Sequence, residues 1–207
     1  MKRHFQIHGR FMFARLILCI AFAAALLSAP ASHAQGSAVQ VDPAQTKIEF
    51  TLGSTLHAVH GAFALKRCSI RYDPASGSIS GAIVVDATSG ESGNTGRDQR
   101  MHREILESAK YPEIVFTPVQ IKGSVAPSGP SNVEVSGKFS LHGKDHDVTL
   151  PVEIVIDGTK LQLTTHFVIP YVEWGLKNPS TFLLRASDKV EIEIHAAGRL
   201  ENATGAQ

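Results

Sequence analysis

Histidine is the residue type in this sequence best suited to acid–base or metal chemistry. Seven of the ten histidines follow residue 34. His57 and His60 form an H-x-x-H pair, and His142 and His146 lie on either side of a glycine-containing turn. A zinc site needs three or four ligands converging at about 2.0–2.1 Å, and a β-strand does not place residues three apart on one face. We therefore predict no metal site and no cofactor.

Sequence motifs of nucleophilic or hydrolytic catalysis are missing. The sequence contains no G-x-S-x-G elbow, no H-E-x-x-H helix and no glycine-rich phosphate loop after a strand. We therefore predict that the chain is not an enzyme. The alternative is a lipid-modifying enzyme in which His57 or His60 transfers protons.

The first 34 residues have the three parts of a secretory signal peptide. Basic residues, from Lys2 to Arg15, precede an apolar run from Leu16 to Leu27, and Ser32-His33-Ala34 offers small residues for cleavage. The apolar run is too short to span a bilayer comfortably. We predict a signal peptide at residues 1–34, export to the periplasm or secretion, and no stable membrane insertion after cleavage.

The remaining chain is slightly acidic and contains one cysteine. Without residues 1–34 it keeps 16 of its 20 Lys and Arg against 19 Asp and Glu, a formal charge of −3. The absence of a basic cluster argues against nucleic acid as a partner, and it argues against electrostatic docking on anionic lipid headgroups. Cys68 alone cannot form an internal disulfide, so the stability of the fold must come from its core. The sequence is compatible with a homodimer.

Short runs of alternating apolar and polar residues recur from Val41 to Leu200, separated by Gly, Pro, Asn, Asp and Ser. This pattern predicts an antiparallel all-β fold. A single helical stretch, Arg97–Ser108, falls between two of the runs, and Ser89–Gly96 before it has the composition of a loop. The strands are expected at 47–52, 62–72 with a bulge near Lys66 and Arg67, 78–86, 113–121, 133–141, 146–156, 161–169 and 190–195.

About eight strands with one apolar face each fit either a sandwich or a sheet closed on itself. Eight is also the strand number at which the interior of a barrel either fills with side chains or holds one small ligand. Periodicity alone does not distinguish a filled barrel from a hollow one. A filled barrel that acts as a structural or interaction module is therefore the alternative to a ligand-binding one.

Three motifs in this order resemble the YceI-like family of exported bacterial proteins. They are STLHAVHGAF at Ser54–Phe63, KYPEIVF at Lys110–Phe116 and VSGKFSLHG at Val135–Gly143. The resemblance implies an eight-stranded antiparallel lipocalin-like barrel with one short helix between strands. It also implies a lipid-binding domain at 40–200, which we expect to be followed by a flexible tail at 201–207.

The resemblance also implies a function, which is to sequester or carry a long-chain apolar amphiphile in the barrel interior. Polyisoprenoids, isoprenoid quinones and fatty-acid derivatives are the ligand classes implied. His57 and His60 are the candidates for contacts with the headgroup of such a ligand. The aromatic candidates for lining the pore or guarding its mouth are Phe50, Phe63, Phe116, Phe139, Phe167, Trp174 and Phe182.

Overall fold

The computed structural model describes residues 36–74 and 76–202, which contain nine β-strands, a single 3₁₀ turn and one short helix formed by α2 and η3. Residues 35–207 form a compact unit of their own. The elements are β1 (Ser37–Val41), η2 (Pro43–Gln45), β2 (Lys47–Leu52), β3 (Val59–Asp73), β4 (Ser78–Glu91), α2 (Thr95–Arg100), η3 (Met101–Ile105), β5 (Glu113–Lys122), β6 (Gly129–Leu141), β7 (Lys144–Asp157), β8 (Lys160–Ile169) and β9 (Val190–Asn202).

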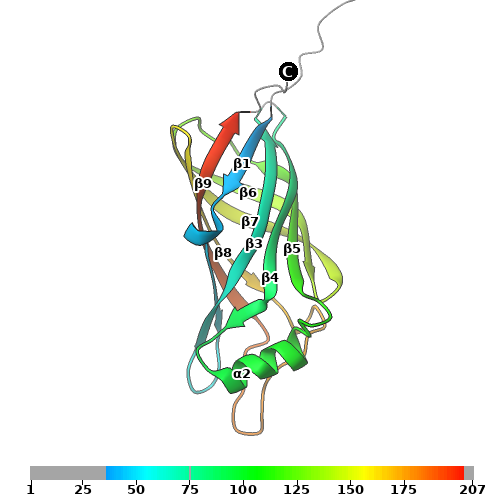
Figure 1. Ribbon diagram of the computed structural model, residues 1–207. Coiled ribbons are helices and arrows are strands. Elements are labelled where there is room, and N and C mark those ends of the chain that lie inside the picture. The colour runs from blue at the N-terminus through cyan, green and yellow to red at the C-terminus, as the bar shows by residue number, and fades with distance from the viewer. Residues whose placement is uncertain (1–35, 75, 203–207) are drawn as a thin grey trace, which may run out of the picture. The chain divides into compact units, whose positions relative to one another are not determined.

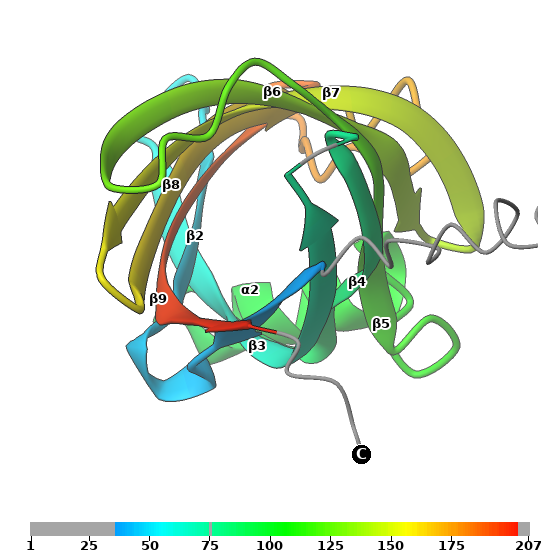
Figure 2. The ribbon, with the colours of Figure 1, turned by 90° about the horizontal axis from the view of Figure 1, so that it is seen from above.

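All strands belong to one antiparallel sheet that closes on itself (Figures 1 and 2). From β3 the order runs through β4, β5, β6, β7, β8 and β9 to β2, which pairs with β3 again. β1 and β2 share one position in the barrel, because each pairs with both β3 and β9 at a different height and η2 separates them. The predicted closed, eight-stranded antiparallel barrel with one short helix is confirmed.

Alternation along each strand separates the barrel interior from solvent. In β2, Ile48 and Phe50 are buried while Lys47 and Glu49 are exposed. The same alternation extends over thirteen residues of β6, where the valines and Phe139 face inward. An antiparallel sheet with one apolar and one solvated face has this pattern. The inward-facing apolar side chains form the inner wall of the barrel.

Tight turns at the two ends of β7 fix the register of its hairpins with β6 and β8. His142 and Gly143 connect β6 to β7 with positive φ angles of 53° and 75°, as a two-residue hairpin turn of the primed type requires. Asp157 and Gly158 begin the β7–β8 turn, where Gly158 has a φ of 62°. The turn between His142 and His146 was expected from its glycine.

All of the predicted strands except β2 extend beyond their predicted ranges, and β4 does so with a consequence for the loop that was expected after it. β4 continues to Glu91, so the prediction of a loop from Ser89 is wrong for its first three residues. The strand persists because Gly90 leaves room for the ring of Phe63, and a side chain at Gly90 would collide with that ring. His102 Nε2 also hydrogen-bonds to the Gly90 carbonyl at 2.8 Å, which ties the strand to η3.

β1 was not predicted, and it begins at Ser37, ahead of the expected domain start at residue 40. At the other terminus β9 reaches Asn202, two residues into the segment expected to be a tail. The predicted signal peptide and residues 203–207 of the predicted tail lie outside the described residues. Within 36–74 and 76–202, no helix has the length and hydropathy needed to cross a bilayer.

The two ends of the barrel differ. One end carries the β3–β4 and β7–β8 turns and the β5–β6 loop, and we call it the turn end (Figure 1). The other end carries α2 and η3, the β2–β3 loop at residues 53–58, and a long irregular segment at residues 170–189, which we call the strap. Seen along the barrel axis, α2 lies across the far opening (Figure 2).

Candidate ligand-binding cavity

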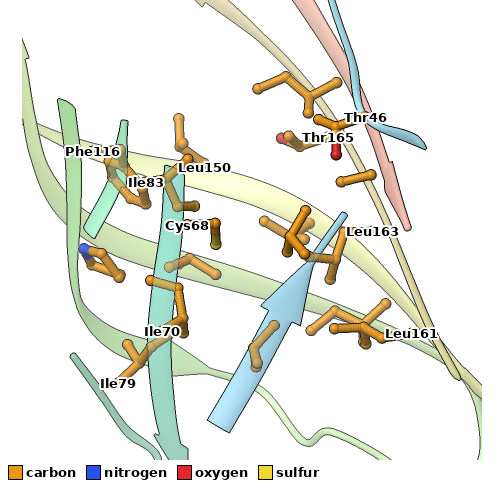
Figure 3. A pocket seen from close by; sticks show the side chains of 18 of the residues that line it. Thr46, Cys68, Ile70, Ile79, Ile83, Phe116, Leu150, Leu161, Leu163 and Thr165 are labelled. Atoms are coloured by element: carbon orange, nitrogen blue, oxygen red, sulfur yellow. The ribbon is translucent and has the colours of Figure 1, made fainter. Parts of the chain in front are cut away.

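A cavity of about 580 Å³ occupies the interior of the barrel. Small-molecule sites in proteins are typically about 300–1,000 Å³, so this volume accommodates a ligand. Every strand contributes to the wall. Figure 3 shows side chains from opposite walls, with Ile70 and Ile79 on one side and Leu161 and Leu163 on the other.

The cavity wall carries no charged side chain and no histidine among the described residues. Its members are Ser37, Val39, Val41, Thr46, Ile48, Phe63, Leu65, Cys68, Ile70, Tyr72, Pro74, Ile79, Ile83, Val85, Ile114, Phe116, Pro118, Ile121, Val125, Ala126, Pro127, Val135, Phe139, Leu141, Leu150, Val152, Ile154, Ile156, Leu161, Leu163, Thr165, Phe167, Ile169, Ile192, Ile194, Ala196 and Leu200.

The polar groups within this wall already have partners or are neutral. Thr46 Oγ1 donates to the Asp42 carbonyl at 2.8 Å, and Thr165 Oγ1 donates to the Pro151 carbonyl at 2.7 Å. Burial raises the pKa of the Cys68 thiol to about 11, so the thiol stays protonated near neutral pH. A polar ligand group placed here would lose water without gaining hydrogen bonds from these two hydroxyls.

The cavity reaches the surface at the turn end. Its wall there includes Pro74 and Pro127, which are both exposed, and the half-buried Ser37 and Val125. A ligand tail can therefore lie along the barrel axis while a polar headgroup stays in water at this end.

The strap closes the opposite end. Its residues Tyr171 and Leu176 are each only 5 % exposed. Trp174 stacks on His146, with ring centroids 4.0 Å apart and planes at 6°, and its ring lies 5.7 Å from that of Phe139. The side chains of Tyr171, Trp174 and Leu176 therefore lie between this end of the cavity and solvent.

Hydrogen bonds join the beginning of the strap to its end, and the shortest of them comes from Tyr171. Tyr171 Oη donates to the Ser187 carbonyl at 2.6 Å, which joins the beginning of the strap to its end. Burial, followed by the nearby charge of Asp188, raises the pKa of Tyr171 to about 12, so the hydroxyl remains a donor at ordinary pH.

Four of the five strand phenylalanines chosen from the sequence line the cavity, namely Phe63, Phe116, Phe139 and Phe167. Phe50 is 7 % exposed and packs beside Phe63, at 5.4 Å between ring centroids, without lining the cavity. Their contact with a ligand stays a prediction.

The other sequence-chosen residues lie away from the cavity. Trp174 belongs to the closure, whereas Phe182 in the same strap is 97 % exposed. His57 lies in the exposed β2–β3 loop. His60 faces outward and shares a hydrogen bond with Thr51 Oγ1 at 3.0 Å. A headgroup role for His57 and His60 stays a prediction.

The sequence reasoning missed the aliphatic majority of the wall. Ile70, Ile83, Leu150 and Leu163 face the cavity, as does Cys68. The alternation pattern marks these residues as inward, but it does not show which inward residues border a void.

His102, His142 and His146 make structural contacts at the closed end, whereas His166 and His195 lie on the outer wall beside Glu191 and Glu193. His142 Nε2 lies 2.7 Å from Glu107 Oε2, and His142 packs on Tyr111 with ring centroids 4.4 Å apart. In the part of the chain that the structure describes, no three His, Cys, Asp or Glu side chains are placed to hold a metal ion.

Residues 39–197 match the YceI-like domain model, which is more than half of the chain. The chain therefore belongs to the YceI-like domain family, and the resemblance seen in the sequence motifs is confirmed. No curated protein sequence matches the chain.

Two solved structures share the fold at low sequence identity. BcnA from Burkholderia cenocepacia is 22 % identical, with a TM-score of 0.62, and the match covers 76 % of this chain and 99 % of BcnA. A polyisoprenoid binding domain from Saccharophagus degradans, implicated in plant cell wall breakdown, is 16 % identical, with a TM-score of 0.59 and coverage of 81 % and 99 %. At these identities the likeness shows a common fold.

Proposed function

We propose that this chain binds the hydrocarbon part of a long-chain amphiphile inside the barrel and sequesters or carries it without chemical change. The observation that carries the proposal is the cavity of about 580 Å³ with a wall free of charged side chains. Removal of apolar surface from water supplies roughly 25 cal/mol per Å², less the cost of immobilising the ligand.

The ligand class follows from the neutral wall. Isoprenoid and acyl chains need no hydrogen bonds from their site, and a headgroup at the turn end stays hydrated. The Saccharophagus degradans neighbour is described as binding polyisoprenoids, which supports a search that starts with polyisoprenoids and isoprenoid quinones.

A binding role without catalysis is consistent with the cavity chemistry. General acid–base catalysis needs a titratable group within hydrogen-bond reach of the reacting atoms. The titratable side chains on the cavity wall are Cys68 and Tyr72, and the high pKa of Cys68 keeps that thiol from acting as a nucleophile near neutral pH.

The proposed compartment is the periplasm or the extracellular medium, on the strength of the signal-peptide pattern in residues 1–34. Expression of the full chain followed by fractionation and N-terminal sequencing tests this. A mature protein that begins at Gln35 in the exported fraction is expected, and a chain that keeps Met1 in the cytoplasm would refute export.

Ligand binding is tested first by mass spectrometry of the organic extract from purified protein. We expect a lipid with a long hydrocarbon tail to be recovered in stoichiometric amounts. Leu163→Trp should reduce the recovery strongly because Leu163 lines the cavity. Val168→Trp on the same strand is the matched control, because Val168 faces solvent at 48 % exposure.

Thermal unfolding shows whether Leu163→Trp is folded. Lipid recovery that stays equal in folded Leu163→Trp and Val168→Trp proteins would place the ligand outside the barrel. Repeated extraction of no lipid, together with failure of added prenyl and acyl probes to bind, would leave the filled-module alternative as the better account.

A further inference from the structure

The largest exposed apolar side chains gather at the closed end of the barrel. Leu56 is 71 % exposed, Leu183 83 % and Phe182 97 %. The other large exposed apolar residues, Val119 and Val168, stand singly on the outer barrel wall at 61 % and 48 %. We call Leu56, Phe182 and Leu183 the apolar tip. Single exposed apolar side chains are ordinary, whereas grouped ones mark interaction sites.

Backbone hydrogen bonds join the two segments that carry the apolar tip, the β2–β3 loop and the strap. Thr55 N donates to the Arg185 carbonyl at 2.9 Å, and Ser187 N donates to the Gly53 carbonyl at 2.8 Å. An isolated β-bridge joins Ser54 to Ala186 between these two bonds. The strap projects at this end of the molecule beside α2 (Figure 1). The tip is therefore a built platform that presents its three side chains to solvent.

Although the chain after residue 34 is slightly acidic and was expected not to dock on anionic lipid, the strap that carries the tip has a local excess of unpaired positive charge. Lys177, Arg185 and Lys189 are exposed, and none of them forms an ion pair with a described residue. The strap acids are Glu173 and Asp188, and Asp188 Oδ1 already accepts a hydrogen bond from Asn178 at 2.7 Å. Cations next to exposed apolar side chains complement the anionic phosphates that border the hydrocarbon of a bilayer.

The size of the tip fits a bilayer better than a protein partner. A large aromatic side chain buries about 150–250 Å², so three side chains fall short of the about 800 Å² that each partner contributes to a stable protein interface. Insertion among lipid chains needs no complementary pocket, and its strength grows with apolar area plus attraction to anionic lipid.

We propose that the apolar tip docks the protein peripherally and reversibly onto an anionic lipid bilayer. Leu56, Phe182 and Leu183 then insert at the boundary between headgroups and acyl chains, while Arg185 and Lys177 lie at the phosphates. The contact does not depend on a ligand in the cavity, so it stands or falls separately from the proposed function.

The test uses residues 35–207, which form a compact unit and lack the apolar run of residues 16–27. Flotation with vesicles of phosphatidylcholine and phosphatidylglycerol should carry the protein with them. The double variant Phe182→Ser/Leu183→Ser should bind about tenfold or more weakly, because it removes most of the inserting apolar area. Val119→Ser, which removes an exposed apolar side chain from the outer wall, should leave binding unchanged.

Two further measurements separate docking from other contacts. Arg185→Glu should weaken binding to phosphatidylglycerol vesicles and leave the weaker binding to pure phosphatidylcholine nearly unchanged. A Phe182→Cys, Cys68→Ser protein labelled with a polarity-sensitive dye should shift its emission to the blue when vesicles are added, which reports burial of the tip in lipid.

The proposal is overturned if the protein does not float with either vesicle type, or if the double variant floats as well as the parent. It is also overturned if the parent forms a dimer that the double variant abolishes while the dye shows no response to vesicles. Each variant is compared with the parent for lipid recovery, so a protein that binds lipid in the cavity but not vesicles refutes docking alone.

Discussion

Neighbouring residues on β3 have opposite chemistry because a bulge reorganises the strand. The register between β3 and β4 shifts between Leu65 and Arg67, and a bulge of this kind sets two residues against one on the partner strand. Lys66 and Arg67 both reach Glu113 Oε1, at 3.0 and 2.9 Å. Cys68, one residue further, faces the cavity. The bulge thus directs Lys66 and Arg67 to the outer ion cluster and Cys68 to the inner wall.

Glu113 gives the protein a specific pH dependence. Hydrogen bonds from Arg67 and then Lys66 lower the pKa of Glu113 from 4.5 to about 2. Because the folded pKa lies below the unfolded one, the stabilisation is fully present above about pH 4.5 and is lost as the pH falls toward 2. We expect Glu113→Gln to lower the melting temperature by a few degrees at pH 7, with the difference shrinking between pH 4.5 and 2.

Glu134→Gln is the control for Glu113→Gln. It removes a single ion pair, with Lys122, whose side chain is 82 % exposed. Such pairs contribute little to stability, so the control should melt close to the parent at every pH. A Glu113→Gln protein with the same melting temperature as the parent at pH 7 would contradict the structural role of this cluster.

At the scale of elements, the alternation of apolar and polar residues made most strands predictable from the sequence. Lys47–Leu52 was expected with the bounds that β2 has, and the bulge was expected near Lys66 and Arg67, where the register shifts. β1 was missed because five residues carry too short a pattern. β1 exists because it fills the gap that β2 leaves between β3 and β9, which is a tertiary requirement.

The candidate site was predictable to a lesser degree than the strands. Strand periodicity identified Phe63, Phe116 and Phe139 as inward residues, and they border the cavity. The irregular strap has no period, so the sequence could not show that Trp174 turns inward while Phe182 points into solvent. Hollow and filled barrels also share one alternation pattern, since the void arises from the curvature of the closed sheet.

The strap is the element on which closure of the cavity depends. Its inner residues are buried and hydrogen bonds such as that from Tyr171 to the Ser187 carbonyl hold it, but it lies outside the strand ladder of the barrel. Segments without regular secondary structure open more readily than the strands around them. We expect ligand release through this end to be limited by the strap.

Tyr171→Phe tests the anchoring of the strap. The change removes one partly buried hydrogen bond, and the Ser187 carbonyl keeps its longer bond from Asn178 Nδ2 at 3.4 Å, so the free energy of unfolding should fall by about 0.5–1.5 kcal/mol. Ligand dissociation, measured by transfer of a fluorescent lipid to vesicles, should become faster if release uses this end.

Tyr72→Phe is the matched control for Tyr171→Phe. Tyr72 lies toward the turn end and lines the cavity there. Its variant should change the unfolding free energy less than Tyr171→Phe does, because no hydrogen bond of its hydroxyl is seen in the described structure. A dissociation rate that rises for Tyr72→Phe and not for Tyr171→Phe would assign ligand release to the turn end.

For the whole molecule, the cavity is a gap in the packing of the core. Residues around an empty apolar space lack contact atoms on one side, and this weakens the folded state. The chain has no internal disulfide among its described residues to offset the loss, since Cys68 is free. A hydrocarbon ligand restores these contacts, so stability and occupancy should be coupled.

Removal of bound lipid should therefore lower the stability of the entire barrel. A ligand that binds only the folded state stabilises it by about 2.7 kcal/mol at a concentration of 100 Kd, which for a domain of this size corresponds to a rise in melting temperature of about 5–10 °C. Delipidated protein, titrated with a prenyl or acyl probe and followed by calorimetry, should show this rise. Leu163→Trp, which narrows the cavity with a larger side chain, should show a smaller rise in melting temperature, whereas Val168→Trp should respond like the parent. Equal shifts in both variants would mean that the probe stabilises the protein from outside, and the cavity would then have no part in lipid binding.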